Sequence, residues 1–219
     1  MHIAITGNIG AGKTTLARQL ADHYGWEVLC EAVDNNPFLA DFYADMPRWA
    51  FHLQIFFLNS RFGQMRRVRA ISDTDKTWLI QDRTIYEDAH IFARNLYQTG
   101  VLTERDYQTY RSVFDNMLSL VRPPDLMIYL RADLPKLRAQ IQKRGRSFEQ
   151  AISDDYLNSL NQLYEEFVAT YHEGPLLCID VNELDHVERE ADFAEIIRQI
   201  DESLSIIPPN SEASQSVRW

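Results

Sequence analysis

Residues 2–20 read HIAITGNIGAGKTTLARQL, and this stretch decides the fold. A strand-like apolar run, His2 to Ile5, leads into residues 7–14, which satisfy the pattern G-x-x-x-x-G-K-[ST]. A helical pattern follows from Thr15 to His23. Strand, glycine-rich loop and helix in this order are the context in which the pattern forms a phosphate-binding loop.

The loop chemistry explains why these residue types occur together. Glycines let the backbone wrap closely around an anion, and the helix that follows adds its partial positive charge. Lys13 is expected to reach the outer phosphates of a nucleotide, and the hydroxyl of Thr14 to hold Mg²⁺. The residues predicted to bind the nucleotide here are Gly7, Asn8, Ile9, Gly10, Ala11, Gly12, Lys13, Thr14 and Thr15.

Composition limits the other function classes. The 219 residues fit one globular domain, and a formal net charge of -10 argues against a general nucleic-acid binder, which needs a basic face. No segment reaches the roughly 20 apolar residues of a membrane span. We therefore expect a cytoplasmic protein without nucleic-acid or membrane partners. Cys30 and Cys178 lie far apart in sequence and are expected to be buried, reduced thiols.

Strand-like runs alternate with segments of helical apolar spacing, which predicts a parallel sheet with helices on both faces. The five predicted strands are 2–6, 26–30, 77–81, 126–130 and 176–181. Ligands of such sheets collect beyond the carboxyl ends of the strands. Glu31 follows the second run and Asp82 and Arg83 follow the third, so these side chains are expected to share a cleft with the loop.

Their chemistry suits phosphoryl transfer to a hydroxyl group. One carboxylate must orient and deprotonate the acceptor, and Glu31 is the best candidate for this general base. Asp82 can hold Mg²⁺ directly or through water. Arg83 can neutralise phosphate charge or clamp the acceptor.

Several motifs, taken together, resemble the deoxynucleoside kinase family over nearly the whole chain. They are GNIGAGKTT (7–15), EAVDNNPFL (31–39), PRWAFHLQIFFLNSR (47–61), DRTIYEDAHIFA (82–93) and KRGRSFE (143–149). The resemblance implies a P-loop kinase fold with a small lid, a homodimer, and transfer of the γ-phosphate of ATP to the 5′-hydroxyl of a deoxynucleoside with Mg²⁺. It places one kinase domain at residues 1–204, with the lid at about 138–150. Residues 205–219, rich in Ser and Pro, are expected to form a disordered tail.

The resemblance also assigns roles around the nucleoside. It makes Glu31 the base at the 5′-hydroxyl, with Arg83 beside it, and matches Tyr43 and Glu149 to the pair that contacts the sugar 3′-hydroxyl. Gln54 matches the glutamine that binds the base edge, because an amide offers both a donor and an acceptor.

Further matches concern the base pocket and the lid. Arg61, on the same predicted helix face as Gln54, matches an arginine paired with an acid, here Asp88. Aromatic pocket positions match Trp49 and Phe92, and Phe57 is either a pocket residue or a core phenylalanine. Lid positions that stabilise the transferring phosphate match Arg144 and Arg146. A further lid arginine of the family is replaced by Gln140, and whether Arg138 substitutes is open.

An arginine held by an aspartate presents donors suited to purines or cytosine, whereas the thymidine-preferring branch of the family is apolar there. We therefore predict a purine preference, for deoxyadenosine, deoxyguanosine or both. Deoxycytidine or broad specificity is the alternative, followed by a nucleoside monophosphate kinase resembling thymidylate kinase and by a non-catalytic nucleotide-binding partner subunit.

Overall fold

The computed structural model describes residues 1–30, 36–72, 78–146 and 149–206, with the side chains of 69–72 left out. The strands are β1 (His2–Gly7), β2 (Glu27–Leu29), β3 (Leu79–Asp82), β4 (Leu126–Arg131) and β5 (Leu176–Asp180). The helices are α1 (Lys13–Tyr24), α2 (Leu39–Ala44), α3 (Met46–Ser72), α4 (Ile85–Glu87), the π-helix η1 (Asp88–Ala93), α5 (Arg94–Gln98), α6 (Glu104–Leu118), α7 (Leu134–Arg144), α8 (Asp154–Thr170) and α9 (Glu190–Ile206).

The strands form one sheet in the order β2-β3-β1-β4-β5, and every neighbouring pair is parallel. This confirms the predicted five-stranded parallel sheet. The third strand differs from its predicted range because its pairing with β1 places Ile5 opposite Asp82. Asp82 is therefore the last residue of β3 rather than the first residue beyond it.

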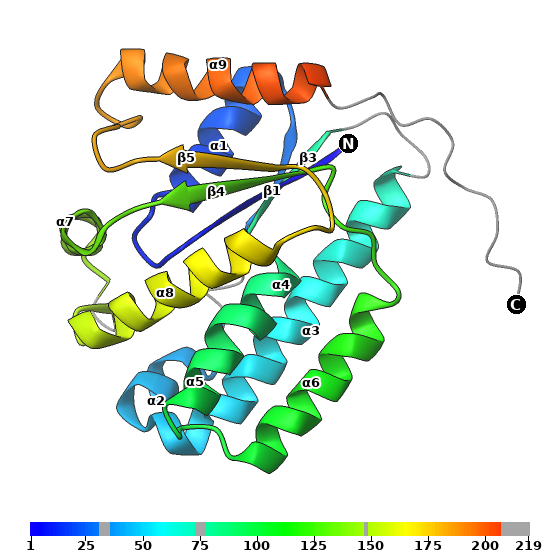
Figure 1. Cartoon of the computed structure of the whole chain (residues 1–219), viewed down its shortest axis with the longest axis vertical. Coiled ribbons are helices and arrows are strands. Elements are labelled where there is room, and N and C mark those ends of the chain that lie inside the picture. The colour runs from blue at the N-terminus through cyan, green and yellow to red at the C-terminus, as the bar shows by residue number, and fades with distance from the viewer. Residues whose placement is uncertain (31–35, 73–77, 147–148, 207–219) are drawn as a thin grey trace, which may run out of the picture.

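Helices cover both faces of the sheet (Figure 1), as predicted. Helices α1 and α9 lie on one face, and α8 lies on the other with the bundle that contains α3 and α6. All six residues of β1 are buried, as expected for a central strand covered on both sides. Two large apolar clusters result, one beneath α1 and α9 around Leu16 and Ile196, and one beneath α8 and α3 around Leu58 and Tyr164.

The order of the strands predicts where on the sheet a ligand binds. Strand β1 lies between β3 and β4, and the connection through α1 leads away from β4 towards β2. Crevices of doubly wound sheets open where connections leave a central strand in opposite directions. The loop after β1 and the residues after β3 meet at this point.

The structure also corrects the expected start of the C-terminal tail and the expected burial of the two cysteines. Helix α9 continues to Ile206, two residues into the predicted tail, and residues 207–219 lie outside the described part of the chain. The expectation of two buried thiols is wrong: both cysteines are free, but Cys30 is half-buried and Cys178 is exposed on the edge strand β5. Within the described ranges, no helix is both long and apolar enough to cross a membrane.

Candidate active site

The loop between β1 and α1 requires its glycines. Gly10 has a φ of 89°, and a Cβ there would lie 2.7 Å from the carbonyl oxygen of Leu137. Only glycine combines that backbone with such a close approach. The ammonium of Lys13 donates to the carbonyl oxygen of Asn8 at 2.7 Å, so its side chain folds back over the loop. The loop thus has the close, wrapped backbone that a phosphate chain needs.

Asn8 ties the loop to α8. Its side-chain amide donates to the carbonyl oxygen of Leu157 at 2.9 Å and to Oδ1 of Asn161 at 2.6 Å. Its own Oδ1 accepts from the backbone N–H of Ile9 at 2.7 Å. Asn161 in turn donates to the carbonyl oxygen of Ala132 at 3.0 Å. The loop conformation is therefore fixed by a helix more than 140 residues away in sequence.

The first helical turn and the end of β3 meet at one hydrogen bond. The hydroxyl of Thr14 donates to Oδ2 of Asp82 at 2.5 Å. The other oxygen of Asp82 is buried and has no hydrogen-bond partner among the described residues. An unpaired, buried carboxylate oxygen beside a hydroxyl fits a divalent cation, because Mg²⁺ prefers oxygen ligands. The two residues predicted to hold the metal therefore lie together.

Arg83 has an unusual backbone. Its φ is 71°, the left-handed region that non-glycine residues rarely adopt, at a cost of about 1–2 kcal/mol. The backbone N–H donates to Ile5 at 3.0 Å, and the guanidinium lies 4.8 Å from the ring centre of Phe92. Strain of this kind is found where a functional side chain must be aimed precisely.

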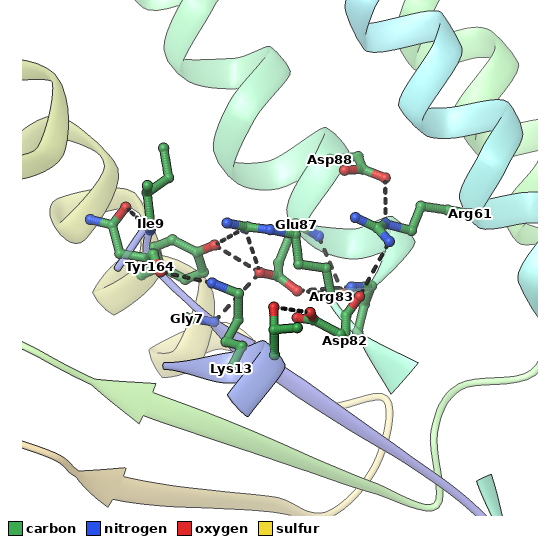
Figure 2. Close-up of polar contacts among 12 residues, drawn as sticks. Gly7, Ile9, Lys13, Arg61, Asp82, Arg83, Glu87, Asp88 and Tyr164 are labelled. Atoms are coloured by element: carbon green, nitrogen blue, oxygen red, sulfur yellow. Dashed lines mark hydrogen bonds and ion pairs between the residues drawn. The ribbon is translucent and has the colours of Figure 1, made fainter. Parts of the chain in front are cut away.

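The guanidinium of Arg83 is held by two buried side chains that the sequence analysis missed. Its Nη1 donates to Oε1 of Glu87 at 3.2 Å and to the hydroxyl of Tyr164 at 3.0 Å. Figure 2 shows the three groups beside Gly7 and Lys13. Glu87 lies four residues after Arg83, a spacing that predicts an ion pair. Tyr164 had no signal, since a tyrosine on an apolar helix face also suits the core.

A cavity of about 450 Å³ brings most of the predicted site together. The predicted residues that line it are Ile9, Gly10, Gly12, Lys13, Thr14, Thr15, Tyr43, Gln54, Phe57, Asp82, Arg83, Asp88, Phe92, Arg144, Arg146 and Glu149. Arg18, Lys143 and Tyr156 also line it and were not predicted. Burial raises the pKa of Tyr156, so its hydroxyl stays protonated at neutral pH.

Two polar features mark the α3 side of the cavity. Gln54 is buried, and its Oε1 has no hydrogen-bond partner among the described residues. Arg61, about two turns further along α3, lies behind the cavity wall with its Nε 3.6 Å from Oδ2 of Asp88. Its Nη1 donates to the carbonyl oxygen of Asp82 at 3.2 Å. The predicted Arg61–Asp88 pair thus forms, with only Asp88 facing the cavity.

The two arginines predicted to belong to a lid lie around a glutamate. Arg144 donates from Nε and Nη2 to Oε2 of Glu149 at 2.9 and 2.5 Å, and Arg146 lies 3.4 Å from Oε1. Arg138 instead pairs with Asp154 at 2.5 Å and is not part of the cavity wall described here. Of the two positions left open by the sequence, Gln140 lines the cavity.

Two predicted residues stand apart. Glu31 lies outside the described residues, so its predicted role as the base stays a prediction. Trp49 is absent from the cavity wall of the described chain, because its ring packs against Phe38 at 5.9 Å and His52 at 5.5 Å. Gly7, Asn8 and Ala11 lie behind the loop surface and support it.

The phosphate loop with the Thr14–Asp82 pair beside it, and buried polar side chains such as Gln54 elsewhere on the cavity wall, is the arrangement typical of P-loop phosphotransferases. Donor phosphates are held at the loop, and the acceptor lies across the same cavity.

Sequence comparison narrows this class. Residues 3–205 match the family described as deoxynucleoside kinase, and the chain belongs to that family. It is 36% identical over 200 residues to the deoxyadenosine/deoxycytidine kinase of Bacillus subtilis, covering 90% of each chain. It is 33% identical over 204 residues to the deoxyguanosine kinase of the same organism, covering 91% of this chain and 96% of the other.

A solved structure agrees with these relatives. Deoxyadenosine kinase from M. mycoides, with the products dCMP and a flexible dCDP bound, superposes with a TM-score of 0.81 at 32% identity. The match covers 92% of this chain and 100% of that one. The same enzyme with bound dATP gives a TM-score of 0.79. The predicted P-loop kinase fold and the predicted family are therefore confirmed, and the chain is a kinase.

Proposed function

We propose that this enzyme transfers the γ-phosphate of ATP to the 5′-hydroxyl of a deoxynucleoside and prefers purines, deoxyadenosine or deoxyguanosine. The observation that carries the proposal is that the phosphate loop, Arg83 and Gln54 line one cavity of about 450 Å³. A cavity of that size suits a small, largely enclosed ligand beside the donor phosphates.

The donor side uses residues 7–15, with Lys13 at the outer phosphates. Thr14 and Asp82 fit Mg²⁺, because a hydroxyl and an unpaired carboxylate oxygen converge there. Bound Mg²⁺ would neutralise charge on the donor phosphates. Arg144 and Arg146 add positive charge from the lid side of the cavity.

The acceptor side orients the nucleoside. Glu31 accepts the 5′-hydroxyl proton as the hydroxyl attacks, and Arg83 stabilises charge at the 5′-oxygen and the transferring phosphate. Tyr43 and Glu149 contact the sugar 3′-hydroxyl. The support for this placement is that Arg83, Tyr43 and Glu149 line the same cavity.

Gln54 and Asp88 recognise the nucleobase in this proposal. The buried Oε1 of Gln54 lacks a partner within the described chain, and a buried acceptor of this kind favours a ligand that donates to it, such as an exocyclic amine. Asp88, neutralised by Arg61 behind it, can accept from the same base edge. Phe57 and Phe92 supply apolar surface to the base plane.

A second candidate is a deoxycytidine or mixed specificity. Two comparisons favour it: one relative is named a deoxyadenosine/deoxycytidine kinase, and the M. mycoides deoxyadenosine kinase was solved with dCMP. Cytosine carries an exocyclic amine as adenine does, so Gln54 and Asp88 suit both.

The test is direct. The protein is incubated with ATP, Mg²⁺ and each of the four deoxynucleosides, and the monophosphate formed is measured. We expect the highest kcat/KM with deoxyadenosine or deoxyguanosine. Higher kcat/KM with deoxycytidine would replace the first candidate by the second. Parallel reactions with deoxynucleoside monophosphates as acceptors should give no diphosphate.

We also propose a homodimer in the cytoplasm, as the family resemblance implies. Static light scattering of the purified protein should give twice the mass of the 25.6 kDa chain. A monomer mass at assay concentration would contradict the dimer.

A further inference from the structure

The hydroxyl of Tyr164 closes a triangle of hydrogen bonds with Arg83 and Glu87. It donates to Oε1 of Glu87 at 2.7 Å and accepts from Nη1 of Arg83 at 3.0 Å. Nη1 also lies 3.2 Å from the same Oε1. Tyr164 and Glu87 are fully buried, and among the described residues only Arg83 of the three lines the cavity.

The carboxylate of Glu87 is fixed on its other side as well. Its Oε2 accepts from the backbone N–H of Thr84 at 2.8 Å and completes the capping box that begins α4. Its Oε1 also lies 3.5 Å from the backbone nitrogen of Gly7, at the end of β1. The group that holds Arg83 therefore has its own position set by the helix start and by the phosphate loop.

We propose that Tyr164 is a positioning residue for phosphoryl transfer: together with Glu87 it fixes the Arg83 guanidinium in one orientation, and it does not touch the substrates. This inference rests on the proposed function. The orientation matters because donors stabilise a transition state only when they are already aimed at the developing charge. An arginine side chain has four rotatable torsions, and a second, directional contact removes the alternatives that a single ion pair leaves.

The ring of Tyr164 has a separate, structural task. It packs on the ring of Tyr129 with centres 5.8 Å apart and an interplanar angle of 15°. Burial and the neighbouring Glu87 raise the pKa of Tyr164 well above its ordinary value, so the hydroxyl keeps its proton and remains a donor. Removing the hydroxyl alone therefore separates the positioning role from the packing.

The chain offers a matched control for that change. Tyr129 is also buried, and its hydroxyl also hydrogen-bonds to a glutamate, Glu165, at 2.9 Å. It lies on β4 and is absent from the cavity wall of the described chain. Tyr164→Phe and Tyr129→Phe each remove one buried hydroxyl from a tyrosine–glutamate pair, and only Tyr164→Phe changes the surroundings of Arg83.

The experiment measures kcat and both KM values with ATP and the best deoxynucleoside, at a temperature well below each variant's Tm. We expect Tyr164→Phe to lower kcat about tenfold with both KM values within about twofold, and Tyr129→Phe to leave kcat unchanged. Glu87→Gln should lower kcat at least as much. The double variant Glu87→Gln/Tyr164→Phe should fall no further, because both substitutions disrupt the same unit.

Each other outcome overturns the inference. If the two phenylalanine variants behave alike, if Tyr164→Phe raises KM without lowering kcat, or if the losses of Tyr164→Phe and Glu87→Gln multiply, Tyr164 and Glu87 do not position Arg83 as one unit. If Tyr164→Phe fails to fold, Glu87→Gln alone must show the kcat-specific loss. A wild-type enzyme that phosphorylates none of the four deoxynucleosides removes the proposed function itself, and this inference with it.

Discussion

The donor side of the cavity is built on one continuous stretch, residues 7–15, with Asp82 beside Thr14. The acceptor side instead joins Gln54 of α3 to Arg83 and Asp88, which follow β3. The donor side consists mainly of backbone N–H groups and one lysine, so it recognises phosphates and is indifferent to the acceptor. The acceptor side relies on side chains whose positions depend on buried partners, such as Asp88 on Arg61. The donor side is thus one short stretch of sequence that α8 holds through Asn8, whereas the acceptor side can be altered by exchanging a few side chains.

The largest effect is expected on the donor side. Lys13→Ala should lower kcat by about 10³-fold, because it removes a charge that acts on the transferring phosphate. The loss should be equal for all four deoxynucleosides, since Lys13 lies on the loop and not on the acceptor wall. The measurement is kcat with each acceptor, together with the Tm as a control for folding.

A loss of kcat in Lys13→Ala that differs between deoxynucleosides would contradict the separation of donor and acceptor sides, because the donor loop would then take part in choosing the nucleoside. An unchanged kcat in a folded Lys13→Ala variant would contradict the phosphate-loop assignment.

The same contrast explains what the sequence could predict. The phosphate loop was predicted residue by residue, because its spacing, its strand and its helix are adjacent in the chain. The sheet followed from alternating strands and helices, although the end of β3 was displaced by one residue. Glu31 and Arg83 were predicted from their positions after strands, whereas the other acceptor residues, such as Tyr43, Gln54 and Asp88, came only from the family resemblance. Tyr164 gave no signal, because its partner Glu87 lies 77 residues away and only the fold brings them together.

Trp49 shows the opposite failure: it was predicted to line the pocket, and it is absent from the cavity wall of the described chain. A tryptophan on a helix beside a pocket can face the ligand or a neighbouring helix, and helical spacing alone does not choose. In the structure its ring faces Phe38 and His52, with Arg48 5.1 Å from the ring centre. Of these neighbours only Phe38 lies outside α3, so the helix pattern alone does not place the ring.

The second prediction concerns the Arg61–Asp88 pair. Asp88→Ala removes the carboxylate 3.6 Å from Nε of Arg61, whose side chain is 1% exposed, and should cost about 3 kcal/mol of unfolding free energy. Arg61→Met with Asp88→Ala removes both charges and should cost less. In both variants kcat/KM for deoxyadenosine and deoxyguanosine should fall by about 10²-fold, while thymidine should lose less.

The measurement is the set of four kcat/KM values in wild type, single and double variants, with urea unfolding of each. KM for ATP should stay within about twofold, because the donor side is untouched. Identical ratios of the four values in all variants would show that the pair does not read the base and would remove the residue-level support for a purine preference.

A third, smaller effect tests how α8 reaches the donor side. Asn161→Ala removes the hydrogen bonds to Asn8 and to the carbonyl of Ala132. Looser loop geometry should raise KM for ATP about fivefold and leave KM for the nucleoside unchanged. Asn158→Ala, on the exposed face of the same helix, is the control and should change neither.

Asn161→Ala and Tyr164→Phe together test whether the donor and acceptor sides of the cavity act separately. One face of α8 would then serve the donor side through Asn161 and the acceptor side through Tyr164, with separable kinetic signatures. A raised KM for the nucleoside in Asn161→Ala would mean that the two sides are coupled.

The last prediction concerns acid and rests on two histidines that do not line the cavity of the described chain. His2, on β1, and His90, on η1, each have a pKa lowered to about 4, chiefly by burial. Arg111 and Arg94 add to the lowering at His90, and Asp115 opposes it. At His90 the ring stacks on Phe167 with centres 5.6 Å apart, so a phenylalanine can take its place.

The direction of the pH effect on stability follows from the pH at which the histidines bind a proton in the unfolded and in the folded chain. An unfolded histidine takes up a proton near pH 6.5, whereas these folded ones resist until about pH 4, so acid between those values favours the unfolded chain. Each histidine should cost about 2 kcal/mol of unfolding free energy between pH 7.5 and pH 5.

His90→Phe should remove about half of the loss caused by this pair, and His2→Gln the other half. Urea unfolding of the wild type and both variants at the two pH values measures the effect. Equal losses in wild type and His90→Phe would mean that His90 is protonated in the folded protein, in conflict with its burial between Phe114 and Phe167.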